Sequence, residues 1–191
     1  PGLAVGDFRV FEDGEPQTIT NFSNQRVPVS LGILLDTSGS MTGSIKLLKE
    51  AAEQFVQRLL PDDKAAVGAF NDKVQLASHF SNDRDGLVTD IRDMDYGNGT
   101  RLYDALNESL DMLRGVDGRK VVLVFTDGDD TSSRLGFGDV LERARKEEVM
   151  IYAIGLQSEY FNGASMVRSR PDRNLKKLAE ETGGGYFELT K

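Results

Sequence analysis

Nearly continuous apolar runs alternate along the chain with segments whose apolar residues recur every three or four positions. Such runs are typical of strands buried on both faces of a parallel sheet, and the three-to-four spacing is typical of helices with one apolar face. The strands expected in this way span residues 28–36, 65–70, 119–127 and 149–156, with shorter ones near 73–77 and at 186–189. The expected helices span residues 44–60, 83–93, 101–115, 138–148 and 173–182.

This alternation of strands and helices predicts an α/β fold with a doubly wound, mostly parallel central sheet and helices on both faces, as in Rossmann-like proteins. Ahead of it, Asp13-Gly14 is a turn signal between two short runs, which predicts a β-hairpin. We therefore expect an N-terminal β-hairpin arm over residues 1–26 and one main domain over residues 27–191. Ligands of such sheets bind at the carboxyl ends of the strands.

Composition narrows the classes of function. The 191 residues carry 31 Asp and Glu against 23 Lys and Arg, a net charge of −8, which argues against nucleic acid or an anionic membrane as the main partner. No cysteine is present and His79 is the only histidine, so thiolate and multi-histidine metal sites are excluded. The apolar runs are too short for membrane insertion. The chain opens at Pro1 with no visible signal peptide, as a processed fragment would.

Three segments place oxygen-bearing side chains where strands end or helices begin. The first buried strand ends in Asp36-Thr37-Ser38-Gly39-Ser40, and the strand at 119–127 ends in Asp127. If both strands are central and parallel, their two carboxylates emerge at one edge of the sheet, and Thr100 reaches that edge from the loop before its helix. Two carboxylates and three hydroxyls suit a hard cation, Mg²⁺ first and Mn²⁺ or Ca²⁺ as alternatives. They also leave a position open for an external ligand.

Each segment also has an ordinary structural interpretation. Ser40 and Thr100 suit the N-cap positions of helices, and Asp127-Gly128 suits a turn. Asp129 and Asp130 either add negative potential near the site or belong to a solvated turn, and we favour the turn. The joint occurrence of the three segments at one edge favours a metal site.

These residues resemble the metal-ion-dependent adhesion site (MIDAS) of the von Willebrand factor A (VWA) domain family, over roughly residues 27–190. The family motif D-x-S-x-S is met by Asp36, Ser38 and Ser40, its threonine by Thr100 and its later aspartate by Asp127. The resemblance implies that the hydroxyls bind the metal and that the aspartates hold it directly or through water. A partner protein's Asp or Glu would complete the coordination.

The resemblance further implies a non-enzymatic, metal-dependent protein-binding or cell-adhesion module. The arm followed by LLDTSGSM resembles a group of exported bacterial VWA-related proteins, which implies an extracellular or periplasmic location. Family members usually continue into a C-terminal helix, whereas this chain stops just after YFEL, so we expect the domain to lack that helix.

The residues at the strand ends also allow two alternative functions. A haloacid-dehalogenase-like phosphatase also carries an Asp after its first strand, but it needs an acid two residues later, where this chain has Ser38, and Lys120 lies at the wrong edge. A VWA-like scaffold with an unused metal site is the second alternative.

No phosphate-binding glycine loop is complete, and His79 is interpreted as a surface or structural residue. The segment 157–172 is either a partner-contact loop or a plain connection.

Overall fold

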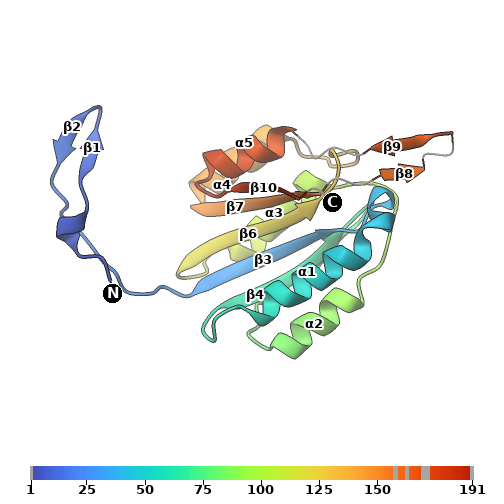
Figure 1. Cartoon of the computed structure of the whole chain (residues 1–191), viewed down its shortest axis with the longest axis horizontal. Helices are drawn as coiled ribbons and strands as arrows, with labels where there is room; N and C mark the ends of the chain where they lie inside the picture. Colours follow the sequence, from blue (N-terminus) through green and yellow to red (C-terminus); the bar gives the residue numbers. More distant parts are fainter. Residues whose placement is uncertain (1, 157–158, 162–163, 169–172, 190–191) are drawn as a thin grey trace.

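The computed structural model describes residues 2–156, 159–161, 164–168 and 173–189. Its main feature is a six-stranded sheet in the order β10-β7-β6-β3-β4-β5, in which every neighbouring pair is parallel except β4 and β5 (Figure 1). The strands are β3 (Val29–Asp36), β4 (Lys64–Phe70), β5 (Val74–Leu76), β6 (Arg119–Thr126), β7 (Val149–Leu156) and β10 (Tyr186–Leu189). The predicted mostly parallel α/β sheet is confirmed.

Helices cover both faces of this sheet (Figure 1). They are α1 (Ile45–Gln57), α2 (Arg84–Arg92), α3 (Leu102–Leu113), α4 (Phe137–Lys146) and α5 (Arg173–Glu181). On β3, Ile33 packs in the core with α1 and α2, whereas Leu34 packs in the core with α3, α4 and α5. Both side chains are fully buried, which explains why this strand has no polar alternation.

Two predicted helices begin later than their sequence patterns suggest. The segment predicted as a helix from residue 44 is preceded by a short 3₁₀ helix, η2 (Gly39–Gly43), and α1 begins only at Ile45. Helix α3 begins at Leu102 with Arg101 at its N-cap, so the interpretation of Thr100 as the N-cap residue is wrong. The loop after β6 caps this helix instead, because Ser133 Oγ accepts the Asp104 N–H at 3.0 Å.

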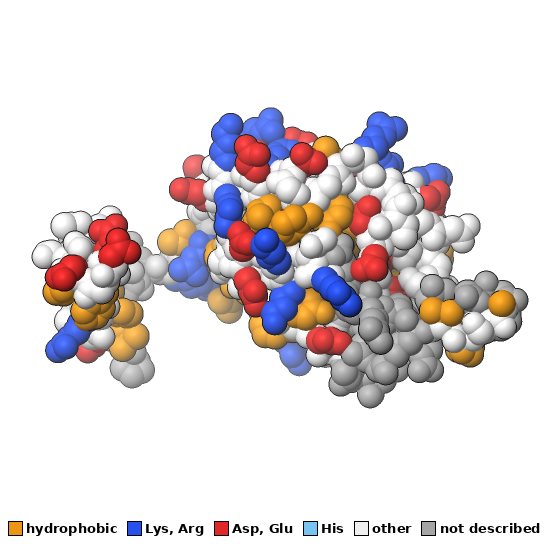
Figure 2. Space-filling model, turned by 90° about the horizontal axis from the view of Figure 1, so that it is seen from above, with side chains coloured by type: hydrophobic (Ala, Val, Ile, Leu, Met, Phe, Trp, Pro, Cys, Tyr) orange, Lys and Arg blue, Asp and Glu red, His pale blue; other side chains and the backbone are white. Residues whose placement is uncertain are grey.

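The predicted N-terminal hairpin is present. Strand β1 (Val10–Glu12) pairs antiparallel with β2 (Glu15–Gln17), after a 3₁₀ helix, η1 (Val5–Asp7). Asp13 and Gly14 form the turn with φ angles of 51° and 87°, the left-handed region that such a turn requires. All residues of both strands are exposed, and the hairpin stands away from the sheet (Figures 1 and 2). Its division from the domain at residues 26 and 27 stays a prediction.

The segment after β7 contains a second hairpin. Strand β8 (Glu159–Phe161) pairs antiparallel with β9 (Met166–Arg168), and the two form a separate sheet. Strand β8 lies beside η2, so this hairpin borders the carboxyl edge of the main sheet (Figure 1). The rest of the predicted loop, residues 157, 158, 162, 163 and 169–172, lies outside the described residues.

One part of the sheet face beside α1 is open. A groove of about 360 Å³ lies there, with Phe55 of α1 on one side and Tyr152, Ile154 and Phe187 of β7 and β10 on the other. The described helices therefore leave part of this face uncovered. Within the described residues, no helix is both long enough and apolar enough to cross a membrane.

Candidate metal centre

The adjacency of β3 and β6 brings the predicted metal ligands together. The two strands pair in parallel in the centre of the sheet, and Leu35 lies opposite Phe125. Asp36 and Asp127 therefore leave the sheet at the same edge, as predicted. Both residues are fully buried at this edge, with no exposed side-chain surface.

Hydrogen bonds link four of the five predicted residues in a chain. The Ser38 N–H donates to Asp36 Oδ1 at 2.9 Å, which folds the loop back over the strand end. The hydroxyl oxygens of Ser38 and Ser40 are 3.2 Å apart, and Ser40 Oγ donates to Asp127 Oδ1 at 2.7 Å. The carboxylates from two strands are thus connected through the Ser38 N–H and the hydroxyls of Ser38 and Ser40.

Thr100 approaches the same edge through its backbone. Its carbonyl accepts hydrogen bonds from Thr131 N at 2.9 Å and Ser132 N at 3.1 Å, in the loop that follows Asp127. The loop before it is attached to the Asp36 segment, where Gly97 N donates to Thr37 O at 3.1 Å. Thr100 is 5% exposed, and among the described residues its hydroxyl has no hydrogen-bond partner. The structure therefore links the Thr100 segment to the loops that follow Asp36 and Asp127, without a side-chain bond from Thr100 to the other four residues.

The electrostatics of this edge suit a cation. Burial raises the pKa of Asp36 to about 6, and the negative charge of Asp127 also raises it. Hydrogen bonds from Ser38 and Thr126 act in the opposite direction and lower this pKa. Within the described part of the chain, no Lys or Arg forms an ion pair with Asp36. A buried carboxylate without a basic partner, beside a second carboxylate and hydroxyl oxygens, is a donor set that fits a hard divalent ion.

The donor set contains few charged groups. The described residues include no group of three or more His, Cys, Asp or Glu side chains arranged around a metal position. The predicted set has only two carboxylates, and its other members are hydroxyls. Any cation bound here would depend on neutral oxygen ligands and on what an external ligand supplies.

Comparison with known proteins identifies the family. The model of the von Willebrand factor type A domain matches residues 31–191, most of the chain. The chain belongs to the VWA domain family. No curated protein sequence matches it. The family model therefore carries the assignment.

Solved structures share the VWA fold at low sequence identity. BatB from Bacteroides thetaiotaomicron superposes with a TM-score of 0.70 at 17% identity, covering 85% of this chain and 91% of that one. A von Willebrand factor type A protein from Catenulispora acidiphila gives 0.72 at 16%, covering 86% and 39%. The vWF domain of the pilus tip protein Mfa5 from Porphyromonas gingivalis gives 0.64 at 13%, covering 86% and 90%. These likenesses establish the fold.

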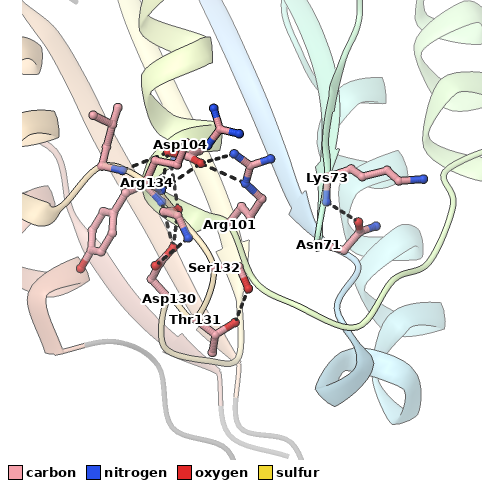
Figure 3. A network of polar contacts seen from close by, with 11 residues as sticks. Asn71, Lys73, Arg101, Asp104, Asp130, Thr131, Ser132 and Arg134 are labelled. Atoms are coloured by element: carbon pink, nitrogen blue, oxygen red, sulfur yellow. Dashed lines mark hydrogen bonds and ion pairs between the residues drawn. The ribbon is translucent and has the colours of Figure 1, made fainter.

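A polar network supports the loop that carries Asp127 in this VWA domain (Figure 3). The Asp104 carboxylate accepts the N–H groups of Arg134 and Leu135, at 3.1 and 3.2 Å, and the guanidinium of Arg101. Asp130 accepts both N–H and O–H from Ser133. Asp129 is exposed, as a solvated turn predicts, whereas the partly buried Asp130 also accepts the Tyr103 N–H at 3.4 Å and so links the loop to the start of α3.

Two residues that orient the site were not predicted from the sequence. Thr126 Oγ1 donates to Asp36 Oδ2 at 2.5 Å and fixes the carboxylate. Asn71 Nδ2 donates to Thr37 Oγ1 at 3.0 Å and, at 3.5 Å, to the carbonyl of Asp95. Their position in the sequence could have indicated this role. Thr126 directly precedes Asp127 at the end of β6, and Asn71 follows the end of β4, whose neighbour β3 leads into the Asp36 loop.

Two residues considered for other chemistry lie elsewhere. Lys120 donates to the carbonyl of Glu147 near the amino end of β6, the end opposite Asp127, as the sequence predicted. His79 is exposed, which agrees with its interpretation as a surface residue, although its Nδ1 lies 3.0 Å from the hydroxyl of its neighbour Ser78.

Proposed function

We propose that this VWA domain is a metal-ion-dependent protein-binding or adhesion module. A divalent cation, Mg²⁺ in the first place, would be held at the carboxyl edge of the sheet and would bind a carboxylate of a partner protein. The residues proposed to hold it are Asp36, Ser38, Ser40, Thr100 and Asp127. The observation that carries the proposal is the chain of contacts from buried Asp36 to buried Asp127, through the Ser38 N–H and two serine hydroxyls.

The chain's own residues prepare the site for this role. Thr126 Oγ1 and the Ser38 N–H each donate to one oxygen of Asp36, which fixes the plane of the carboxylate. Asp127 accepts from Ser40 and so restrains the position of that hydroxyl oxygen. Such supporting hydrogen bonds orient metal ligands in proteins. A divalent ion bound there would attract an anionic oxygen, because hydroxyl ligands neutralise none of its charge.

Family membership supports a role in interaction. VWA domains generally act as non-enzymatic interaction modules, and we propose no catalytic activity for this one. One structural neighbour is the vWF domain of a pilus tip protein. We propose an extracellular or periplasmic location for this chain as well. Its net charge of −8 is consistent with a metal-bridged partner in place of nucleic acid.

Calorimetric titration of chelator-treated protein with Mg²⁺, Mn²⁺ and Ca²⁺ tests the metal site. We expect saturable binding at one site, lost in Asp36→Ala and kept in Asp90→Ala, because Asp90 is exposed on α2. Cooperative thermal unfolding of Asp36→Ala would show that the fold is intact. Binding retained in Asp36→Ala would contradict the assignment, and no binding by the wild type would favour a scaffold with an unused site.

A phosphatase assay tests the enzymatic alternative. We expect no turnover of p-nitrophenyl phosphate in the presence of Mg²⁺. Turnover by the wild type that is lost in Asp36→Asn would overturn the binding-module proposal, since it would make Asp36 a nucleophile.

A further inference from the structure

The pair Asn98-Gly99 lies in the loop that leads into helix α3. Asn98 is exposed, and a Cβ placed on Gly39 would lie 3.7 Å from its side-chain amide oxygen. Gly39 separates the two serines proposed as metal ligands. The amide of Asn98 therefore borders the loop that carries both serines, at the carboxyl edge of the sheet.

An asparagine followed by glycine is chemically labile. The backbone nitrogen of the next residue can attack the side-chain Cγ of asparagine, and glycine hinders this attack least because it has no Cβ. The chain has eight asparagines, of which only Asn98 and Asn162 precede glycine, and Asn162 lies outside the described residues. Asn98 is therefore the candidate for this reaction within the described part of the chain.

The fold leaves the two reacting groups free. Among the described residues, neither the side chain of Asn98 nor the N–H of Gly99 has a hydrogen-bond partner. The N–H groups on either side are bonded, since Asn98 N donates to Asp72 Oδ1 at 3.3 Å and Thr100 N donates to Thr131 Oγ1 at 3.0 Å. The loop is thus anchored on both sides of an N–H that is available for reaction.

We propose that Asn98 is a site of spontaneous deamidation, and that its conversion adds a third carboxylate beside the candidate metal centre. The backbone nitrogen of Gly99 loses its proton to solvent and bonds to Asn98 Cγ, while the side-chain nitrogen takes up a proton and leaves as ammonia. Water then adds to one carbonyl of the resulting cyclic imide and breaks its bond to the imide nitrogen, which gives Asp or isoaspartate. Both products carry one carboxylate in place of the neutral amide, and neither step needs an oxidant.

A carboxylate at this position changes the electrostatics of the site. The proposed donor set has only two carboxylates, Asp36 and Asp127, and the described residues hold no group of three acidic side chains around a metal position. An added negative charge at the border of this set attracts a hard cation. We expect Asn98→Asp to bind Mg²⁺ about tenfold more tightly than the wild type. The deamidation is independent of the proposed function, whereas its effect on cation binding rests on it.

Peptide mapping by mass spectrometry tests the reaction in the folded protein. After incubation in warm, mildly alkaline buffer, trypsin releases residues 93–101, which contain Asn98, and residues 102–114, which contain Asn107. We expect the first peptide to gain the acid form, at a rate that rises with pH because the nucleophile is the deprotonated nitrogen. The second is the internal control, because Asn107 precedes Glu and its side chain accepts from Arg143 at 2.6 Å.

Variant and unfolded samples complete this test. Asn98→Gln should keep its amide, because the longer side chain would have to close a less favourable six-membered ring. An endoproteinase that cleaves before Asp but not before isoaspartate separates the two products. An unchanged peptide 93–101 from the folded protein, beside conversion in urea-unfolded protein, would show that the fold protects Asn98 and would overturn the inference.

Calorimetric Mg²⁺ titration tests the effect of the new charge. The matched control is Asn82→Asp, an exposed position next to Ser81, which bridges to Ala65 at the amino end of β4. It adds the same charge at the opposite end of the sheet and should leave the Mg²⁺ affinity nearly unchanged. Equal affinity of Asn98→Asp and Asn82→Asp would overturn the added-carboxylate effect. No Mg²⁺ binding by any of these proteins would contradict the proposed function, while the peptide map would still decide on deamidation.

Discussion

Replacement of Asp104 by alanine should destabilise the domain more than any surface charge change. This residue is 7% exposed, and its carboxylate joins helix α3 to the loop that carries the candidate ligand Asp127. Removal of the carboxylate would leave the N–H groups of Arg134 and Leu135 without their acceptor and the Arg101 guanidinium without its ion pair.

The magnitude follows from these contacts. Removal of one partner of a buried charged pair lowers the free energy of unfolding by about 3–5 kcal/mol. The side chain of Arg101 is 24% exposed and can be hydrated again, so we expect the lower end, about 3 kcal/mol. For a domain of this size, that loss corresponds to a fall in melting temperature of about 6–12 °C. Asp104→Asn keeps one acceptor oxygen, so its free energy of unfolding should fall by about half as much as that of Asp104→Ala.

The effect should also depend on pH. Burial alone would raise the pKa of Asp104, but hydrogen bonds from Arg134, Arg101 and Leu135 bring it below its usual range. An unfolded Asp has a pKa of about 3.9. The stabilisation from ionised Asp104 is therefore complete above that pH and is lost as the pH falls toward the folded pKa. The difference between the wild type and Asp104→Asn should stay constant near neutral pH and shrink in acid.

Urea unfolding followed by circular dichroism, over a series of pH values, measures these free energies. Asp111→Ala is the matched control, because its side chain on the same helix is 53% exposed and pairs with Arg143 and Arg114. It should cost no more than about 1 kcal/mol. The reasoning is wrong if Asp104→Ala costs no more than Asp111→Ala, or if the deficit of Asp104→Asn is the same in acid as at neutral pH.

Two further predictions concern the frame of the sheet. Asp63→Ala should lower the free energy of unfolding by about 2 kcal/mol, since the Asp63 carboxylate accepts the N–H groups of Val29 and Leu60 and pairs with Arg26. Exposed Asp62→Ala should have little effect in the same urea titration, and equal losses would contradict the role of Asp63. Gly184→Ala should cost more than about 2 kcal/mol, because its Cβ would lie 1.9 Å from the Ile151 carbonyl oxygen. Gly138→Ala in α4 is the control, because its Cβ would meet no atom and should stabilise the helix by up to about 1 kcal/mol. Similar melting temperatures of the two variants would refute the clash at Gly184.

The hydrophobic pattern was sufficient to predict the sheet and its helices. Leu31, Ile33 and Leu34 could only be buried together in a strand covered on both faces, and the structure covers both faces of β3. Because parallel strands end at one edge, the sequence also predicted that Asp36 and Asp127 would meet. Local composition likewise predicted the Asp13-Gly14 hairpin, since few residues tolerate its backbone conformation.

The helix starts were less predictable. A threonine before an apolar helical pattern is an ordinary N-cap, yet Asp130 and Ser133 supply the acceptors at the start of α3. These residues come from a loop about thirty positions later, and no local rule of propensity shows which loop will approach a helix end.

The sequence by itself determined the strands of the main sheet, the helices that cover it, the family and the set of candidate ligands, because periodicity and short motifs depend on neighbouring residues. It did not predict the β8–β9 hairpin or η2. Only the tertiary structure decided that Thr126 orients Asp36, that Asp104 is a buried acceptor and that β8 borders η2. The physical reason is one of range and precision. A hydrogen bond between distant segments forms only when strand register and loop path bring a donor and an acceptor to about 3 Å, and the whole packed domain fixes that distance.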